Sequence, residues 1–195
     1  ACGPLGYAMV DAEHAKHVVA VTDHITNDPP RLCIPGRQIS QVVQVKSIGT
    51  AAQIVSGTTG RLPSDKGRAI AEMTAQLIEA SGLLRDGFSF QTGAGATSLA
   101  VAQALGPVMA LRGTVGSFAA GGITAPLVDM FHQGLFRRLM DVQAFDLTAV
   151  ASYRNDPDHL AMSAAQYASP LHDDAIANKL DVMILGAAEV DTEFN

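Results

Sequence analysis

Two glycine-rich segments have the pattern expected of a site for an anionic oxygen. The first, Gly93-Ala94-Gly95, follows a short apolar stretch and precedes a helical pattern that opens at Thr97 and Ser98. Glycine lets the backbone approach a ligand closely, and the first N–H groups of a helix carry its positive dipole end, with Thr or Ser available as the N-cap. We therefore predict a turn here whose amides bind an oxygen anion.

The second segment, Gly121-Gly122, repeats this order of features. A strand of small residues precedes it, Thr124 follows as the expected N-cap, and Pro126 comes early in the expected helix. Neighbouring parallel strands end at the same edge of a sheet, so two such turns predict one shared cleft. A structural interpretation stays open, in which the glycines serve only tight turns from strand to helix.

Polar side chains that hold oxygen ligands without ionising accompany these turns. We predict that Gln91, Thr92 and Ser117 bind carboxylate or thioester oxygens. For Gln91 and Thr92 the alternative is ordinary hydrogen bonding at the end of a strand. Glu189 and Asp191 project to the same side of an extended backbone. They could orient a substrate or bind a cation, or they could mark the solvated end of a strand.

Several common chemistries lack their motifs. A dinucleotide fingerprint requires a third glycine where Ser98 stands, and no Gly-Lys-Ser/Thr follows either turn. No serine occupies a Gly-x-Ser-x-Gly elbow, and we expect His132 within a helix and His159 at the start of a strand, as structural or exposed histidines rather than bases. Cys2 and Cys33 have no metal-ligand spacing, so we expect ordinary thiols and no metal.

Composition narrows the class of protein further. The 195 residues are 48% hydrophobic and 16% charged, which is enough apolar material for a sizeable α/β core. The net charge is -6 and the basic residues form no cluster, so we expect no nucleic-acid partner. No signal peptide is visible, and no apolar run approaches the ~20 residues that would span a bilayer, so we expect a cytoplasmic protein without a membrane partner.

The periodicity predicts alternating strands and helices after an irregular stretch. We place a domain boundary or linker near residue 60, and then a helix capped by Ser64, ended by Gly82 and buried through one apolar face. That face comprises Ile70, Met73, Leu77 and Ile78. We expect strands over 17–22, 42–46, 88–91, 114–119, 136–142, 159–163 and 181–187, and helices over 97–105, 125–133, 146–153 and 173–179.

These elements predict an α/β fold with a mainly parallel sheet and helices on both faces. The first strand, 17–22, and especially the last, 181–187, read as buried strands because their apolar runs are nearly continuous. Ligands in such sheets bind beyond the carboxyl ends of the strands, where both glycine turns would lie.

Five segments resemble the citrate lyase alpha chains, which belong to the CoA-transferase fold families. They are SFQTGAGATSLAVAQAL, SFAAGGITAPLVDMFHQGL, LMDVQAFDL, the segment 166–170 (QYASP) and AAEVDTEFN. Members of this family are longer and have two similar α/β halves. The resemblance implies that this chain is a fragment, with residues 1–60 the end of a first CoA-transferase-like domain plus linker and 61–195 much of the second.

The resemblance also implies an activity. Such a chain exchanges acetyl for citryl on the thioester of a carrier protein, whose prosthetic group is CoA-like, within an oligomeric complex with beta (lyase) and gamma (acyl carrier) chains. Its substrates are citrate and the acetyl thioester. Related CoA-transferases carry a catalytic Glu in the region matching Ser117 to Ala120, where this chain has no carboxylate. That departure implies direct attack by citrate, without a covalent enzyme intermediate.

On this interpretation, Gly93, Ala94 and Gly95 face the thioester and Gly121 and Gly122 face a carboxylate. Two other functions stay open. The chain could be a non-catalytic regulatory domain that binds phosphate or a sugar phosphate, because glycine turns bind phosphates equally well. It could also be a part that only contributes structure to a larger assembly. The exact acyl acceptor, the oligomeric state and the use of free CoA are not specified by the sequence.

Overall fold

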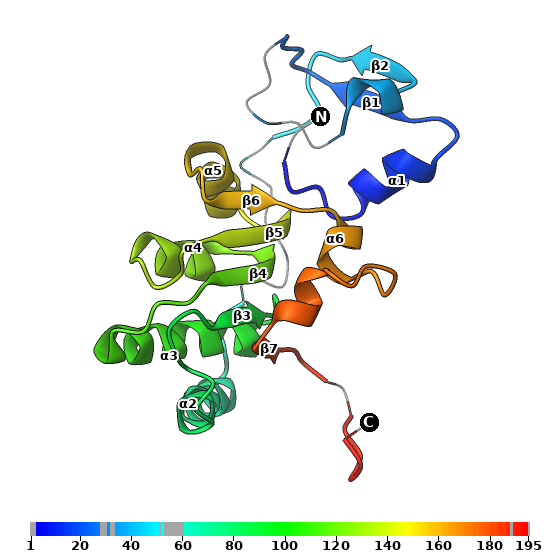
Figure 1. Ribbon diagram of the computed structural model, residues 1–195. Helices are drawn as coiled ribbons and strands as arrows, with labels where there is room; N and C mark the ends of the chain where they lie inside the picture. The colour runs from blue at the N-terminus through cyan, green and yellow to red at the C-terminus, as the bar shows by residue number, and fades with distance from the viewer. Residues whose placement is uncertain are drawn as a thin grey trace.

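A five-stranded parallel sheet forms the centre of the molecule (Figure 1). The computed structural model describes residues 3–27, 31, 34–50, 52, 61–187 and 189–194. The strands are β3 (Ser89–Thr92), β4 (Phe118–Ile123), β5 (Leu139–Ala144), β6 (His159–Ala161) and β7 (Val182–Ile184), in the spatial order β6-β5-β4-β3-β7. All four strand pairings are parallel, so the predicted mainly parallel α/β fold is confirmed.

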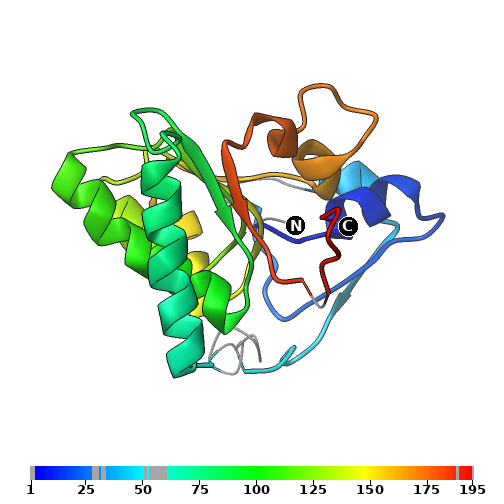
Figure 2. The same cartoon turned by 90° about the horizontal axis from the view of Figure 1, so that it is seen from below.

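Helices lie on both sides of this sheet (Figure 2). The crossovers α3 (Ala96–Arg112), α4 (Ala125–His132) and α5 (Leu147–Asn155) cover one face, and α2 (Asp65–Ala80) packs on α3 from outside. From β6 the chain returns to β7 across the opposite face through α6 (Ala164–Ala168) and the 3-10 helix η3 (Ile176–Lys179). Strand β3 therefore lies between β4 and β7, with α3 behind it and α6 in front.

The core lies between the sheet and the crossover helices. Three aromatic rings, Phe88, Phe90 and Phe136, pack with centroids 5.6–6.5 Å apart at its centre. All three are at most 2% exposed, and the aliphatic side chains of α3 and α4 close around them. This packing fixes β3 and β4, and with them the carboxyl edge of the sheet.

The N-terminal part forms a smaller unit. It contains α1 (Ala8–His14), β1 (Val19–Thr22), the 3-10 helix η1 (Gly36–Gln38) and β2 (Gln41–Gln44), and β1 and β2 pair in parallel as a separate sheet. The Gly6 amide donates to the Val142 carbonyl at 2.7 Å. The Arg31 guanidinium donates to the carbonyls of Asp156 and His159. This unit is therefore tied to the β5–β6 end of the main sheet.

Several predicted details of packing are wrong. In α2, Ser64 is the N-cap as predicted, and its hydroxyl accepts from the Gly67 amide at 3.1 Å. However, Ile70, Met73 and Leu77 are 49–69% exposed, and of the predicted face Ile78 alone is buried. The buried face carries small residues, Gly67, Ala71 and Ala75 with Ile78, because α2 packs closely on another helix and not on the sheet.

Both strands that we expected to be buried are partly exposed. Val19 and Val21 of β1 are more than half exposed. Strand β7 is an edge strand in which Met183 is 41% exposed, so its continuous apolar run did not indicate burial on both faces.

Some predictions fall on residues that the structure does not describe. Cys2 and Cys33 lie outside the described residues, and so does most of the predicted linker, 53–60. The division into two domains therefore stays a prediction. Within the described ranges, no helix is long and apolar enough to cross a membrane.

Candidate functional site

The first glycine turn leaves the start of α3 open. Gly95 is the N-cap, with φ -74° and ψ 153°, and no side chain caps the helix. The prediction that Thr97 or Ser98 caps it is wrong, because the helix begins at Ala96 and includes both. A helix without a side-chain cap keeps first-turn N–H groups that have no intrahelical acceptor. Among the described residues, no atom lies within 4 Å of a Cβ built at Gly95, so the turn is open at this position.

The residues just before this opening fix the turn. The Gly93 amide donates to the Ile184 carbonyl of β7 at 2.7 Å, so this amide is already used within the sheet. The Thr92 hydroxyl donates to the Ser98 carbonyl at 2.7 Å, and Thr92 is 3% exposed. These bonds hold the end of β3 against the first turn of α3. For Thr92 they agree with the alternative of strand-end hydrogen bonding.

The second glycine pair lies inside a strand, so the predicted turn directly after the strand is wrong. Gly121 and Gly122 are both part of β4, and the pairing with β5 shifts between them, from Asp141 to Gln143. Such a bulge bends the strand locally. Gly121 has φ +103°, a conformation that side chains with a Cβ rarely adopt. This glycine is therefore required by the backbone.

The start of α4 is already occupied by the protein itself. Thr124 is the N-cap and Pro126 lies in the first turn, as predicted, but the Ala125 amide donates to Asp146 Oδ2 at 2.7 Å. In addition, a Cβ at Gly122 would lie 2.0 Å from the Phe145 ring, so this ring covers the glycine. The two predicted anion-binding helix starts therefore differ: that of α4 is closed by Asp146, whereas that of α3 has no side-chain cap among the described residues.

A side-chain pair lies beside the first turn. Gln91 is 5% exposed, and its Oε1 accepts a hydrogen bond from the Tyr167 hydroxyl at 2.6 Å. The Gln91 side chain crosses over Gly121, with Cγ and Cδ 3.2 Å from the position that a Cβ would take there. Burial raises the pKa of Tyr167, although the bond to Gln91 opposes this, so the hydroxyl keeps its proton as a donor.

Tyr167 was not singled out from the sequence. It lies on α6, a helix that our sequence reasoning missed and that begins with a capping box of Ser163 and Gln166. The pattern Ser-x-x-Gln is a recognisable helix start and would have placed Tyr167 in the first turns of a helix. We call Gln91, Gly93–Gly95, Gly121 and Tyr167 the carboxyl-edge site.

Besides Thr92, three predicted substrate-binding residues are not part of the carboxyl-edge site. Ser117 precedes β4 at the opposite edge of the sheet, where its hydroxyl donates to the Phe88 carbonyl at 3.1 Å. It lines a hollow of about 600 Å³ together with Arg137 and Arg138. Glu189 and Asp191 are both exposed in the tail after β7 (Figure 1), and the Asp191 carboxylate accepts from the Glu193 amide.

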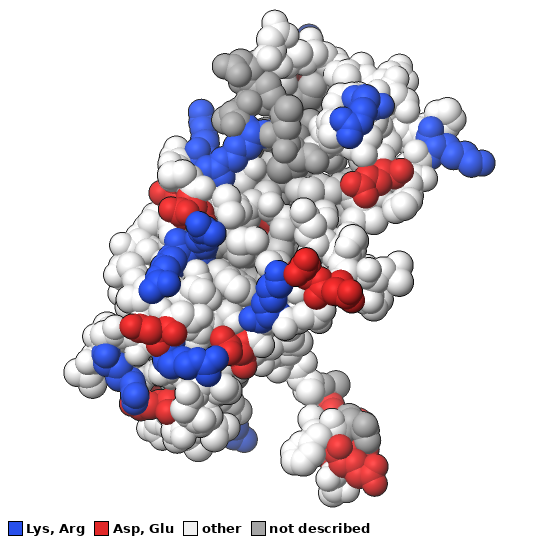
Figure 3. All heavy atoms as spheres, in the orientation of Figure 1, with Lys and Arg blue, Asp and Glu red and all other residues white. Residues whose placement is uncertain are grey.

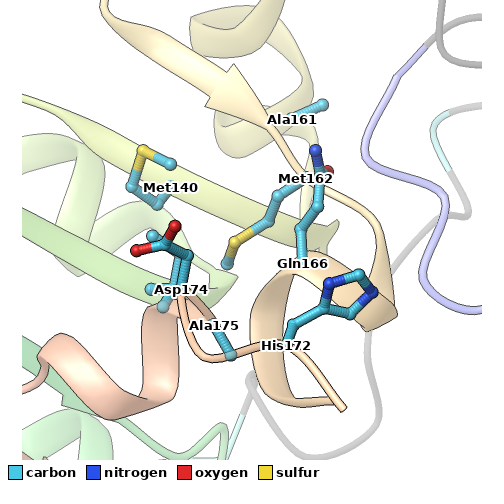
Figure 4. A pocket seen from close by; sticks show the side chains of 8 residues that line it. Met140, Ala161, Met162, Gln166, His172, Asp174 and Ala175 are labelled. Carbon is cyan, nitrogen blue, oxygen red and sulfur yellow. The ribbon is translucent and has the colours of Figure 1, made fainter.

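A pocket of about 300 Å³ lies on the α6 face of the sheet (Figure 4). The close-up shows Met140 from the sheet opposite the chain that carries Gln166, His172 and Asp174. The full lining is Met140, Ala161, Met162, Gln166, His172, Asp174, Ala175 and Ile176. Gln166 precedes Tyr167 on α6, so this short helix contributes both to the pocket and to the carboxyl-edge site.

A buried polar network lies behind the sheet and resembles a hydrolase triad in composition. His159 contacts Asp141 Oδ2 at 3.0 Å through Nε2 and Ser152 Oγ at 2.9 Å through Nδ1. However, Asp141 and His159 are 0% exposed and Ser152 is 3% exposed, so no substrate reaches them. The Ser152 hydroxyl donates to Asp156 at 2.6 Å and therefore does not donate to the histidine. His159 is thus a buried structural histidine.

This network holds the β4–β5 bulge. Asp141 Oδ1 accepts from the Ile123 amide at 3.4 Å, directly after the bulged glycines. Burial raises the pKa of Asp141, and the contact with His159 only partly offsets this. For Asp156 burial is again the largest single influence, but hydrogen bonds from Ser152 and His132 outweigh it and lower the pKa of this carboxyl.

The surface charges are mixed. On the face shown in Figure 3, lysine and arginine side chains alternate with aspartate and glutamate and form no continuous basic area. Among the described residues, no three histidine, cysteine, aspartate or glutamate side chains lie together as a metal site would require.

Comparisons with known proteins agree on one family. The sequence model of the family "Citrate lyase, alpha subunit (CitF)" matches residues 1–195. The chain is 43% identical to the citrate lyase alpha chain of Escherichia coli and 41% identical to that of Haemophilus influenzae, in each case over its full length. It covers 38% and 39% of those two proteins, so it spans a little under two fifths of the curated relatives that it matches.

A solved structure is also similar over the whole chain. It is a crystal structure from Streptococcus mutans, assigned to the alpha subunit of citrate lyase and in complex with citrate. The TM-score is 0.89 at 38% identity, with all of this chain and 38% of that one covered.

Proposed function

Because the chain belongs to the citrate lyase alpha subunit family, we propose that it forms part of a transferase that exchanges acetyl for citryl on a carrier-protein thioester. The family match covers every residue of the chain, and this is the observation that carries the proposal. The bound citrate of the Streptococcus mutans structure supports citrate as the acyl acceptor. We place the activity in a cytoplasmic complex with beta and gamma chains, as the sequence led us to expect.

The reaction requires two acyl transfers that balance without the enzyme's own nucleophile. A citrate carboxylate oxygen attacks the acetyl thioester carbon, and the thiolate of the CoA-like group leaves. The thiolate then attacks the citryl carbon of the mixed anhydride, and acetate leaves as the citryl thioester forms. No carboxylate occurs between Ser117 and Ala120 to form an acyl-enzyme, which supports this direct route.

The protein must then position the reactants and stabilise each oxyanion. We assign the oxyanion contact to the open amides from Ala94 onward at the start of α3, with Gly93 and Gly95 shaping the turn. We assign the Gln91 amide to the same ligand, because Gln91 belongs to β3 and this strand leads directly into the turn. Gly121 makes room for Gln91, and Gly122 makes room for Phe145.

In this proposal Thr92 has a structural part, and Ser117, Glu189 and Asp191 have no part. The alternative, a regulatory domain that binds phosphate or a sugar phosphate, uses the same open helix start. The two functions differ in outcome: a regulatory domain would bind such a phosphate tightly and would not exchange acyl groups.

Replacing Gly95 with valine tests the assignment. The position has φ -74° and an empty surrounding, so Gly95→Val should fold normally while its side chain covers the first-turn amides. Loss of one oxyanion donor typically costs ~10²–10³ in rate, and we expect a fall of that size in acetyl-to-citryl exchange. The assay uses the full-length chain in its complex with acetylated carrier protein and citrate.

Gly36→Val is the matched control, because Gly36 is exposed, also has open space, and lies on η1 in the N-terminal unit. It should exchange at the wild-type rate. Exchange at an undiminished rate in Gly95→Val would remove the α3 amides from the mechanism.

A further inference from the structure

The hydrogen bond between Tyr167 and Gln91 determines which end of the Gln91 amide is free. Oε1 accepts from the tyrosine hydroxyl at 2.6 Å, so Nε2 is the end left for another partner. Nε2 donates to no side chain or carbonyl among the described residues. Among the described residues, Thr124 Oγ1 is the one side-chain polar atom that is buried from solvent and has no hydrogen-bond partner. Nε2 of Gln91 has no partner there either, so it must be accessible to solvent.

The rest of the Gln91 side chain is held firmly. Gln91 is 5% exposed, and its Cγ and Cδ rest against the backbone of Gly121. Successive residues of a strand point to opposite faces, and accordingly Gln91 reaches α6 while Thr92 reaches α3. The remaining freedom is the rotation that exchanges Oε1 and Nε2. If this rotation brought Oε1 to the position of Nε2, the oxygen would repel an oxyanion or a carboxylate, so the rotation would weaken substrate binding in the proposed reaction.

We propose that Tyr167 is a positioning residue, which holds the Gln91 amide with Nε2 presented as a hydrogen-bond donor to a substrate oxygen. This inference rests on the proposed transferase function and extends it to a residue on another element. Tyr167 itself does not touch the reacting atoms in this account. In the observed arrangement its protonated hydroxyl occupies Oε1, and Nε2 is the end of the amide that remains for a substrate oxygen.

The test compares three variants of the full-length chain in its complex. Tyr167→Phe removes the hydroxyl and keeps the ring. Gln91→Glu keeps an oxygen that accepts from Tyr167 but replaces the free donor with an acceptor. Tyr153→Phe is the matched control, because Tyr153 lies on α5, on the opposite face of the sheet from α6, and undergoes the same chemical change.

We expect Tyr167→Phe to lower kcat for exchange about five- to tenfold, the effect of one neutral hydrogen bond, with KM for citrate nearly unchanged. Tyr153→Phe should leave both constants unchanged. In the Gln91→Glu background, which should be much slower than wild type, adding Tyr167→Phe should cause no further fall in kcat. Gln91→Leu, an uncharged replacement of similar size, repeats this cycle in case the glutamate disturbs folding.

The outcomes distinguish a positioning role of Tyr167 from a structural one. A purely structural role for Tyr167 would lower thermal stability and would reduce kcat by the same factor in both backgrounds, which overturns the inference. The inference also fails if Tyr167→Phe exchanges as fast as Tyr153→Phe. A wild-type complex that exchanges no acyl groups would instead refute the proposed function, so the two failures are distinguishable.

Discussion

Removal of the Asp141 carboxylate should destabilise the protein more than removal of any exposed acid. Asp141 and His159 are both 0% exposed and lie 3.0 Å apart. Loss of one partner of such a buried pair costs ~3–5 kcal/mol, because the other partner is left buried without compensation. Asp141→Ala would also deprive the Ile123 amide of its acceptor at the bulge. We therefore expect a decrease of ~3–5 kcal/mol in the free energy of unfolding.

Two comparison variants make the measurement specific. Asp158→Ala removes an acid that is 58% exposed and lies 3.5 Å from Arg138, and such surface pairs contribute ~0–1 kcal/mol. Asp141→Asn preserves the shape, an oxygen for Ile123 and an N–H group for His159, so it should cost ~1 kcal/mol. Urea denaturation of the full-length protein at neutral pH gives all three values, provided that the m-values agree.

The order of the three free-energy changes tests whether the buried network stabilises the sheet. If Asp141→Ala costs no more than Asp158→Ala, the buried network does not support the sheet, and its geometry has no energetic consequence. If Asp141→Asn costs as much as Asp141→Ala, the contribution comes from the charge and not from satisfied hydrogen bonds.

Two further results are expected from the same part of the molecule. Gly121→Ala should lower the free energy of unfolding by ~1–3 kcal/mol, because φ is +103° there, and should also slow acyl exchange by displacing Gln91; unchanged exchange would separate this glycine from the site. Burial raises the pKa of Asp141 above 3.8, so the part of the stability that arises from this shift is complete below pH 3.8 and is lost as the pH rises through the raised pKa. Relative to Asp141→Asn, the wild type should lose up to ~1.4 kcal/mol per pH unit across that window in denaturation curves, and a parallel pH dependence of both proteins would contradict the shift.

The alternation of strands and helices along the chain, apart from α6, could be predicted because apolar runs alternate with helical patterns between glycines. The packing of α2 could not, since an apolar stripe and a stripe of small residues run along the same helix. A sheet would have selected Ile70, Met73 and Leu77 for burial. The actual neighbour is a helix, where a Cβ at Gly67 would already lie 2.9 Å from Thr97 Oγ1, so close approach selects the small residues.

The open turn at Gly93–Gly95 was visible locally, because glycine, strand end and helix start are adjacent in the sequence. The pairing of Gln91 with Tyr167 joins residues 76 positions apart, and it depends on the return of the chain across the sheet. The carboxylate that occupies the start of α4 likewise comes from the next crossover, at Asp146. Local pattern identified the groups that could bind, and the fold determined which of them are free.

The internal carboxylate of Asp146 makes the two helix starts unequal. A free anion that approached α4 would have to displace a competitor that is covalently attached and always in place, whereas α3 has no side-chain cap. The same carboxylate accepts from the Ala149 amide through Oδ1, so one side chain closes the starts of two successive helices and links α4 to α5.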